Sequence, residues 1–222
     1  MSRETARTPT QQRILDAALA LFNETGIERV SLYRIAAQVG ISQGNLTYHF
    51  ALKQDLVFAL IHQLETEMTL VLSQRRDVTT RSMANYLVTL FRVMWKHRFF
   101  FVSFTYLVRD DPLIEESYNR LAMIAQEGSM KRIDDAAAVG DIAMIRPPNS
   151  SRILAENMWA TWINQICIGG RSGPERTEVE TIYDCCLHHL SLIHPYAPEG
   201  YILRIVRKVE AALGLEPVPY KV

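Results

Sequence analysis

Apolar residues recur at helical spacing along almost the whole chain. In residues 10–26 they form one stripe, which predicts a first helix that Thr10 caps and Gly26 ends. The same spacing predicts further helices in the ranges 31–39, 42 to about 50, 52–74, 81 or 82 onward, 99–108 after a bend, 112–139, 150–168, 175–194 and 199–213. We find no strand pattern and no internal repeat, so we expect an all-α fold.

Two short helices joined by a glycine turn are predicted within residues 31–49. The first has its apolar residues on one face and ends at Gly40, since glycine tolerates the left-handed conformation of a sharp turn. Ser42 is a good N-cap for the second helix, in which Leu46 points inward. Two helices joined in this way form a helix-turn-helix. The alternative is that they are simply two small helices of an all-α core.

The stretch also carries a longer motif of glycine, apolar and polar positions. Its matching residues are Gly26, Ile35-Ala36, Gly40-Ile41-Ser42, Gly44, Leu46, His49-Phe50 and Lys53. In these residues the chain resembles the TetR family of transcriptional regulators. Two positions depart from the family pattern: Thr47 stands where Tyr is usual, and Leu52 stands where Ser or Asn usually caps the next helix. The match is strong over about the first quarter of the chain, and the remainder is similar only in helical layout.

The resemblance implies an N-terminal three-helix helix-turn-helix DNA-binding domain, followed by a larger helical ligand-binding and dimerisation domain. We expect these domains to occupy residues 1–51 and 52–222. Residues 1–9 are polar and are expected to form a flexible arm.

Three residues of the second short helix are candidates for reading bases. The amides of Gln43 and Asn45 can form bidentate hydrogen bonds to adenine in the major groove, and the Thr47 methyl group can pack on thymine. No Arg or Lys lies between Ser42 and Phe50. We therefore expect this helix to read little guanine.

Other polar residues around the motif are candidates for phosphate contacts. Ser31 caps the first short helix, whose free backbone N–H groups can face a phosphate, and Ser42 does the same for the second. By resemblance to the family, Tyr48, His49 and Lys53 contact the DNA backbone. The alternative for Tyr48 and His49 is packing between the two domains.

Large aromatic and methionine side chains are concentrated in the middle of the chain. Such residues at helical spacing more often form plain core than a ligand site, yet ligand pockets are also mostly apolar. By resemblance to the family, one effector cavity should lie in this helical bundle, and we expect an apolar or aromatic small molecule there. The candidate lining residues are Trp95, Phe99, Phe104, Tyr106, Tyr118, Met158 and Trp162, with Tyr106, Tyr118, His97 or Asn157 orienting the ligand.

A metal or redox site is a weaker interpretation of the cysteines. Cys185 and His189 are four residues apart on a predicted helix and could chelate one ion, but two ligands do not complete a site. Cys186 is expected to pack as a small apolar residue. We expect no metal site and no cofactor. The sequence contains no nucleophile elbow, phosphate-binding glycine loop or paired-carboxylate pattern, so we do not expect an enzyme.

The composition fits an ordinary soluble globular protein. Of the 222 residues, 48% are hydrophobic and 22% are charged, and the 24 basic residues balance the 24 acidic ones. A neutral chain is unsuited to coating nucleic acid nonspecifically, but specific DNA binding stays open. The apolar run at residues 99–108 is too short to span a bilayer, and the three cysteines do not form a disulfide framework. We expect a cytoplasmic protein without a membrane partner.

The leading hypothesis is a ligand-responsive repressor that binds a pseudo-palindromic DNA operator as a homodimer. The apolar stripes of residues 150–168 and 175–194, which include Trp162 and Cys186, are the expected dimer surface. A ligand in the middle bundle would release DNA through the helix at residues 52–74. The alternative is a helical small-molecule-binding or adaptor protein without specific DNA binding, supported by the neutral charge, the cation-free second helix and Thr47.

Overall fold

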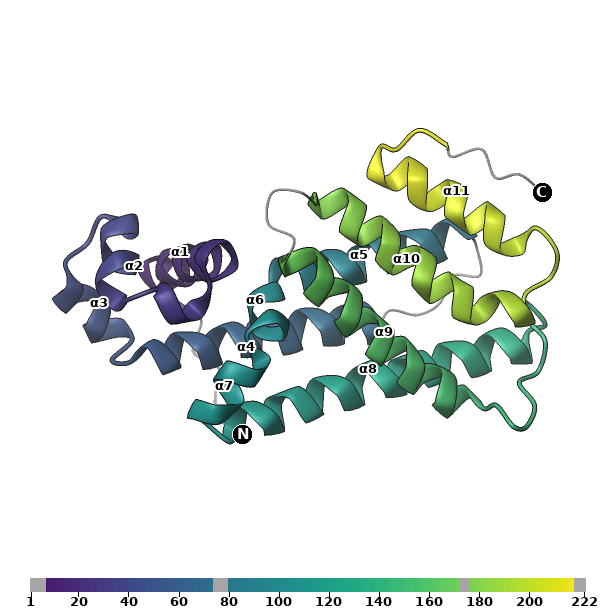
Figure 1. The fold of residues 1–222 in the computed structure, drawn as a ribbon, viewed down its shortest axis with the longest axis horizontal. Coiled ribbons are helices and arrows are strands. Elements are labelled where there is room, and N and C mark those ends of the chain that lie inside the picture. Colours follow the sequence, from purple (N-terminus) through teal and green to yellow (C-terminus); the bar gives the residue numbers. More distant parts are fainter. Residues whose placement is uncertain (1–6, 74–79, 172–175, 218–222) are drawn as a thin grey trace.

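The computed structural model describes residues 7–73, 80–171 and 176–217 (Figure 1). Over these ranges the chain forms helices and no strand, which confirms the expected all-α fold. The elements in chain order are α1 (Pro9–Thr25), η1 (Ile27–Arg29), α2 (Leu32–Val39), α3 (Gln43–His49), α4 (Lys53–Ser73), α5 (Thr80–Lys96), α6 (Arg98–Val102), α7 (Phe104–Asp110), α8 (Leu113–Ala138), α9 (Ser151–Arg171), α10 (Glu178–Ile193), η3 (His194–Tyr196) and α11 (Tyr201–Leu213). The residues expected to form a flexible arm lie mostly outside the described ranges. Residue 74, the predicted end of one helix, and residue 175, the predicted start of another, also lie outside them.

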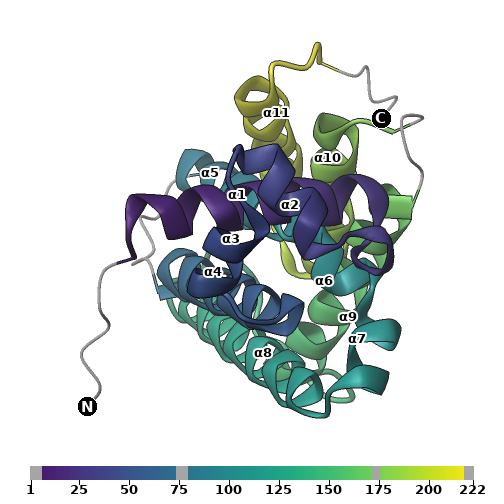
Figure 2. The same cartoon turned by 90° about the vertical axis from the view of Figure 1, so that its left-hand side faces the viewer.

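Helices α1 to α3 form a small cluster at one end of the molecule, and α4 leads from it into a larger bundle (Figure 1). In the bundle α4 packs against α5 and α8, α9 packs against α8 and α10, and α11 packs against α5. Figure 2 looks from the side of the small cluster and shows α4 and α8 running side by side behind it. The buried apolar residues of both parts belong to one continuous core. The domain boundary after residue 51 stays a prediction.

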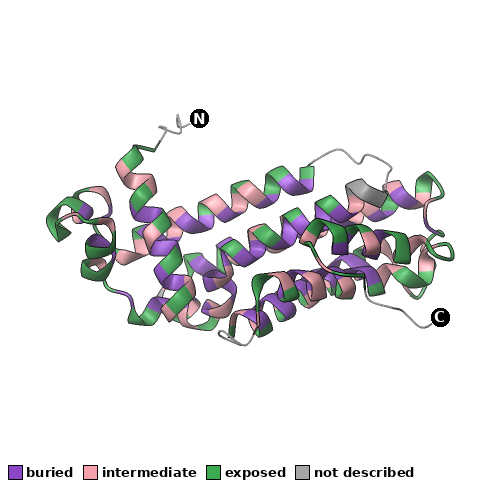
Figure 3. Ribbon diagram, turned by 90° about the horizontal axis from the view of Figure 1, so that it is seen from above, coloured by how far each residue is buried: buried purple, intermediate pink, exposed green. Residues whose placement is uncertain are grey.

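The inward faces of the long helices are buried and their outer faces are exposed (Figure 3). Among the described residues, α4 alone has the length and composition that could cross a membrane. In this structure its residues Leu56, Leu60 and Leu64 are fully buried in the core, where α4 contacts α5 and α8. Packing in the core therefore accounts for the apolar composition of α4.

The first helix begins two residues earlier than the sequence analysis expected. Thr8 is the N-cap: its hydroxyl accepts a hydrogen bond from the Gln11 N–H at 3.2 Å, and the Gln11 side chain accepts one from the Thr8 N–H at 2.9 Å. The prediction of Thr10 as the cap was wrong. Pro9 is suited to the first helical position because its missing N–H would have no partner there.

Two helix boundaries in the middle of the chain also differ from the prediction. The expected helix at residues 99–108 is broken at Ser103 into α6 and α7. Helix α8 begins at Leu113, one residue later than predicted, and the carboxylate of Asp111 accepts the Leu113 N–H at 2.9 Å. Gly128 does not interrupt α8. A Cβ atom there would lie 3.2 Å from the Leu72 side chain, so this glycine marks a close approach of α8 to α4.

Helix α9 passes through both of its glycines and ends at Arg171. The prediction that this helix ends at residue 168, before the two glycines, was therefore wrong. A Cβ atom on Gly169 would overlap the side chain of Thr181 on α10, and one on Gly170 would lie 2.7 Å from Val102 on α6. The two glycines let neighbouring helices approach α9 closely. Helix propensity takes no account of such contacts, so it wrongly indicates that glycine ends the helix.

The apolar stripes of α9 and α10 are used inside the protomer. Trp162 and Cys186, which the sequence analysis placed on a dimer surface, are both completely buried in the single chain. That assignment of residues was wrong, because the stripes pack against each other and against α5 rather than facing outward. A dimer surface on these helices would have to use their other faces.

Candidate DNA-binding surface and ligand cavity

The turn between α2 and α3 has the geometry of a helix-turn-helix. Gly40 adopts a left-handed conformation with φ of 76°, which its lack of a Cβ atom permits, and it ends α2. Ser42 then caps α3, since its hydroxyl accepts the Asn45 N–H at 3.1 Å. Leu46 is fully buried and holds α3 to the cluster. These three features confirm the local structure predicted for residues 31–49.

The outer face of α3 presents the predicted base-reading residues. The side chains of Gln43 and Asn45 are exposed. Thr47 is half-buried, and its hydroxyl lies 3.1 Å from the carbonyl oxygens of both Gln43 and Gly44. Because the hydroxyl is used within the helix, the methyl group is the part of Thr47 suited to a contact with thymine.

The predicted phosphate-contacting residues lie around the same face. Tyr48 is 86% exposed, so it does not pack between the two parts of the chain as the alternative interpretation held. His49 is half-buried, with its ring centroid 5.3 Å from that of Tyr48. The exposed Ser31 caps α2, accepting the Arg34 N–H at 3.2 Å. All three residues are therefore within the surface that surrounds α3 and the start of α2.

Lys53 occupies a more enclosed place than a simple phosphate contact would need. Its ammonium group donates hydrogen bonds to the carbonyl oxygens of Ile27 at 3.0 Å and Val30 at 3.2 Å. These bonds tie the start of α4 to the connection between α1 and α2. A contact between Lys53 and the DNA backbone stays a prediction. In such a contact the ammonium group would bind a phosphate and these two carbonyl oxygens at the same time.

Sequence reasoning missed Tyr33, which is 69% exposed on α2 near Ser31. The signal was present, because Tyr33 lies off the apolar stripe that includes Ile35 and Ala36, and both of these are buried. A large aromatic residue on the polar face of a helix can contact a partner rather than the core.

Several aromatic residues expected to line a ligand cavity pack on one another instead. The ring centroids of Phe104 and Tyr118 are 4.4 Å apart, those of Tyr118 and Trp159 are 5.7 Å apart, and those of Trp159 and Trp162 are 6.5 Å apart. Tilted and edge-on contacts at these distances are typical of a packed aromatic core.

The remaining predicted ligand-binding residues lie in different places. Trp95 has the Arg98 guanidinium 4.3 Å from its ring, and Phe99 packs against Phe22 with ring centroids 5.5 Å apart. Tyr106 lines a groove of about 280 Å³ between the small cluster and α7 and α8. At this groove the Gln54 side chain donates a hydrogen bond to Asp111.

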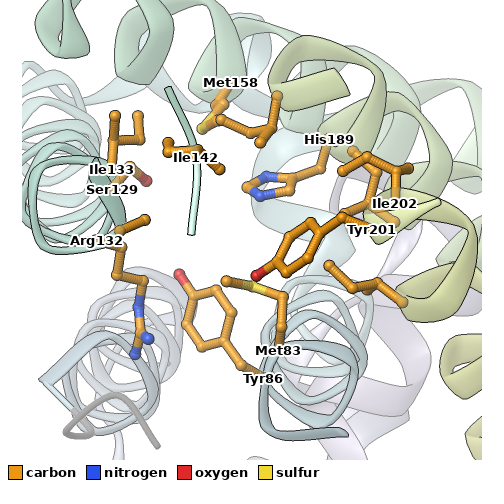
Figure 4. A pocket seen from close by; sticks show the side chains of 14 residues that line it. Met83, Tyr86, Ser129, Arg132, Ile133, Ile142, Met158, His189, Tyr201 and Ile202 are labelled. Atoms are coloured by element: carbon orange, nitrogen blue, oxygen red, sulfur yellow. The ribbon is translucent and has the colours of Figure 1, made fainter. Parts of the chain in front are cut away.

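A separate cavity lies at the end of the bundle far from α3. Its volume is about 50 Å³. Its lining residues are Met83, Tyr86, Ser129, Arg132, Ile133, Ala136, Ile142, Met158, His189, Leu190, Ile193, Tyr201, Ile202 and Ile205 (Figure 4). Met158 is the one residue shared with the predicted set. The other predicted residues do not line this cavity.

The polar groups of this cavity are held in their neutral forms by burial. Burial raises the pKa of the Tyr86 phenol to about 12, although the nearby Arg132 acts in the opposite direction. Burial, with a smaller contribution from the Arg132 charge, lowers the pKa of His189 to about 4. The Ser129 hydroxyl is buried without a hydrogen-bond partner. Near pH 7 these three side chains are uncharged hydrogen-bonding groups.

The cysteines lie in apolar surroundings. Cys185 and Cys186 are completely buried, and burial raises the pKa of both thiols, that of Cys185 to about 12. A buried, protonated thiol is a poor nucleophile and a poor metal ligand. In the part of the chain that the structure describes, no three His, Cys, Asp or Glu side chains are grouped to hold a metal ion.

Comparisons with known proteins agree with this geometry. Residues 14–60 match the family described as bacterial regulatory proteins, tetR family, and residues 62–201 match one described as bacterial transcriptional repressor. The chain belongs to the TetR family of transcriptional regulators, which are DNA-binding proteins and not enzymes. An HTH-type transcriptional regulator of Staphylococcus aureus is 45% identical over 53 residues. That match spans 24% of this chain and only 29% of the relative.

Solved structures share the fold over nearly the whole chain. A TetR-family transcriptional regulator from Marinobacter aquaeolei VT8 has a TM-score of 0.79 and 26% sequence identity, covering 92% of this chain and 98% of that one. The SmeT-triclosan complex has a TM-score of 0.60 and 21% identity, covering 87% of this chain and 94% of that one. At 21% identity the likeness to SmeT concerns the fold alone.

Proposed function

We propose that the chain is a cytoplasmic, ligand-responsive repressor that binds a pseudo-palindromic operator as a homodimer. The observation that supports this most is the outer face of α3. There Gln43, Asn45 and Tyr48 are exposed, while the buried Leu46 fixes the helix to the cluster. Side-chain amides on such a helix can pair with adenine in the major groove.

A homodimer would present two copies of α3 to one face of DNA. Two-fold symmetry and a separation of about 34–36 Å between the two α3 helices would match successive major grooves. We propose that the outer faces of α9 and α10 form the dimer surface. The exposed apolar residue Ile168 lies on that face of α9, and Leu187 is half-buried on α10.

The ligand response would start at the cavity that Figure 4 shows and would pass along α5 as well as α4. Tyr86 near the start of α5 lines the cavity, and Lys96 at the end of α5 accepts a hydrogen bond from Asn23 on α1 at 2.8 Å. Tyr86 and Lys96 are about 15 Å apart along the helix axis. A ligand that favours one position of α5 would therefore shift the cluster that carries α3.

The first test is selection of bound sequences from a random duplex pool at about 0.15 M salt, where screening weakens nonspecific attraction. We expect the recovered sites to be pseudo-palindromic, with adenine at the positions that Gln43 and Asn45 reach. Gln38→Ala is the matched control for substitutions of Gln43 and Asn45, because Gln38 is also exposed but lies on α2 and not on α3. If a folded dimer enriches no sequence, the proposal fails and the helical small-molecule-binding or adaptor protein replaces it.

A further inference from the structure

We propose that the cavity between α5, α8, α10 and α11 selects an uncharged, largely apolar molecule whose carbonyl oxygen accepts a hydrogen bond from His189. This inference rests on the proposed ligand response and names the chemistry of the ligand. It follows from which groups around the cavity can donate hydrogen bonds and from the cost of burying a charged ligand against apolar walls.

The walls of the cavity require a mostly apolar ligand. Met83 on α5, Ile133 on α8 and Ile202 on α11 face it, together with Ile142 from the connection after α8 and Met158 on α9 (Figure 4). Burying apolar surface against such walls is the main source of affinity in small-molecule sites. A strongly polar ligand would leave these walls without a matching surface.

The hydrogen-bonding direction of His189 is fixed by its neighbour. Trp162 Nε1 donates to His189 Nδ1 at 3.2 Å, and an indole N–H can only donate. His189 is neutral near pH 7, so its single ring proton is on Nε2. Nε2 is therefore a donor, and a ligand that offers it an acceptor atom gains a hydrogen bond. A carbonyl oxygen is such an acceptor.

Two hydroxyl groups add to this donor character. Ser129 is only 3% exposed, and its hydroxyl has no hydrogen-bond partner within the described chain. The Tyr86 phenol keeps its proton because burial raises its pKa to about 12. Figure 4 shows the Tyr86 hydroxyl and the His189 ring directed toward the same space. A buried hydroxyl without a partner is costly, which indicates that a ligand group or a bound water completes the bonding of Ser129.

The charge of Arg132 acts on the cavity, because it contributes to the lowered pKa of His189, but its guanidinium group already interacts with other parts of the chain. The guanidinium carbon of Arg132 lies 3.7 Å from the centroid of the Tyr86 ring, and Nη2 donates to the Val71 carbonyl oxygen at 3.5 Å. In Figure 4 the guanidinium group is turned away from the centre of the cavity. No Asp or Glu is among the described residues that line it. An anionic ligand would be attracted by Arg132, but it would lose its hydration against the apolar walls, and that desolvation is costly. We therefore infer that the ligand is uncharged.

The test is calorimetry on the 222-residue chain, without DNA, with three probes of similar shape. Acetophenone carries a carbonyl oxygen, cumene has no acceptor, and benzoate is an anion. We expect acetophenone to bind about 3- to 10-fold tighter than cumene, the range for one neutral hydrogen bond. Benzoate should bind more weakly than acetophenone.

Variants at position 189 separate the hydrogen bond from the shape of the cavity. In His189→Phe the preference for acetophenone over cumene should disappear. His189→Gln keeps a donor amide and should retain the preference, and His188→Phe, at an exposed position of the same helix, should bind the probes like the original chain. His189→Phe also leaves the buried Trp162 N–H without its acceptor, so thermal unfolding of each variant is measured first. If His189→Phe does not fold, the comparison of His189→Gln with the original chain decides.

Each outcome bears on the inference. Equal binding of acetophenone and cumene would contradict the hydrogen bond from His189. Tighter binding of benzoate than of acetophenone would contradict an uncharged ligand. If the folded protein binds none of the probes, the cavity is not a site for such molecules. A preference that is lost in His189→Gln also contradicts the donor role. If acetophenone binds as expected but does not change operator affinity, the chemistry of the cavity is supported and the ligand response under the proposed function fails.

Discussion

The side-chain oxygen of Asn23 accepts a hydrogen bond from the backbone N–H of Phe99 at 2.9 Å. The amide nitrogen of the same side chain donates to the Lys96 carbonyl oxygen at 2.8 Å. One residue of α1 therefore bonds both sides of the turn between α5 and α6. Next to this turn, Glu67 on α4 pairs with the Lys96 ammonium at 2.6 Å and lies 3.4 Å from the buried His97. Helices α1, α4 and α5 are thus joined at one place.

Replacing Asn23 by alanine should loosen this connection. In Asn23→Ala the Phe99 amide loses its acceptor, so we expect its hydrogen exchange to become at least about tenfold faster, and the free energy of unfolding to fall by about 1–3 kcal/mol. The Leu107 amide, which bonds to the Ser103 carbonyl oxygen, is the internal reference. Glu24→Ala, at an exposed neighbouring position, should leave exchange at Phe99 unchanged, and the same rate in both variants would contradict the role of Asn23.

The proposed base readers predict a loss of specificity without a loss of stability. Asn45→Ala should weaken operator binding by about 1–3 kcal/mol and relax the preference at one adenine, because one bidentate contact is removed. The melting temperature should not change, since the side chain is exposed. Operator titrations with single base substitutions measure this. A uniform loss across all sequences would indicate instead that Asn45 contacts the DNA backbone.

The close packing of α9 on α10 predicts a steric effect at Gly169. Gly169→Ala should lower the free energy of unfolding by about 1–3 kcal/mol, because the new methyl group would overlap the Thr181 side chain. Adding Thr181→Ala should recover part of that loss by removing the overlapping atoms. Chemical denaturation of the two single variants and the double variant measures the effect. Additive losses in the double variant would show that the overlap is not the cause.

The neutral His189 predicts a pH dependence of stability. Its pKa is about 4 in the folded chain and near its ordinary value of 6.5 in the unfolded chain, so the unfolded state binds the proton more readily. Stability should therefore fall as the pH drops from about 6.5 to 4 and lose no more from this group below that range. His189→Phe should remove this part of the pH dependence. Denaturation at a series of pH values, compared with His188→Phe, tests it.

Glu67 should act in a lower pH range. Burial alone would raise the pKa of its carboxyl group, but the interactions with His97 and Lys96 together lower it to about 2. The stabilisation from this carboxylate is complete above pH 4.5 and should be lost as the pH falls toward 2. In Glu67→Gln the part of the pH dependence that this carboxylate contributes should be lost in that range. An unchanged profile would mean that the carboxylate contributes little.

The sequence was sufficient where local chemistry decides the structure. Ser31, Gly40 and Ser42 have the predicted capping and turn roles, because a hydroxyl acceptor and a left-handed glycine act on backbone groups within a few residues. The error at the first helix is also local. Thr8 and Thr10 can both cap a helix, and Pro9 between them favours Thr8 because proline suits the first helical position.

The sequence was insufficient where distant segments decide. Helix α9 was predicted to end before Gly169. A glycine is needed at this position because the side chain of Thr181, on another helix, leaves no space for a Cβ atom. Trp162 has the periodicity of a surface stripe or of a core residue, and only the packed bundle shows that it is completely buried. The cavity brings together Tyr86, Ser129 and His189 from three helices. The spacing of residues within one helix cannot predict which residues of other helices lie next to it.

The pair formed by Trp162 and His189 gives the protein a built-in optical reporter. The indole and imidazole rings are stacked, with centroids 5.6 Å apart and planes 30° apart, and the indole N–H donates to the imidazole. Indole emission responds to the hydrogen bonding and charge of its immediate surroundings. A molecule that bonds to the other side of the imidazole will therefore change the intrinsic fluorescence of Trp162. Occupancy of the cavity can be followed in the unlabelled protein while DNA binding is measured separately.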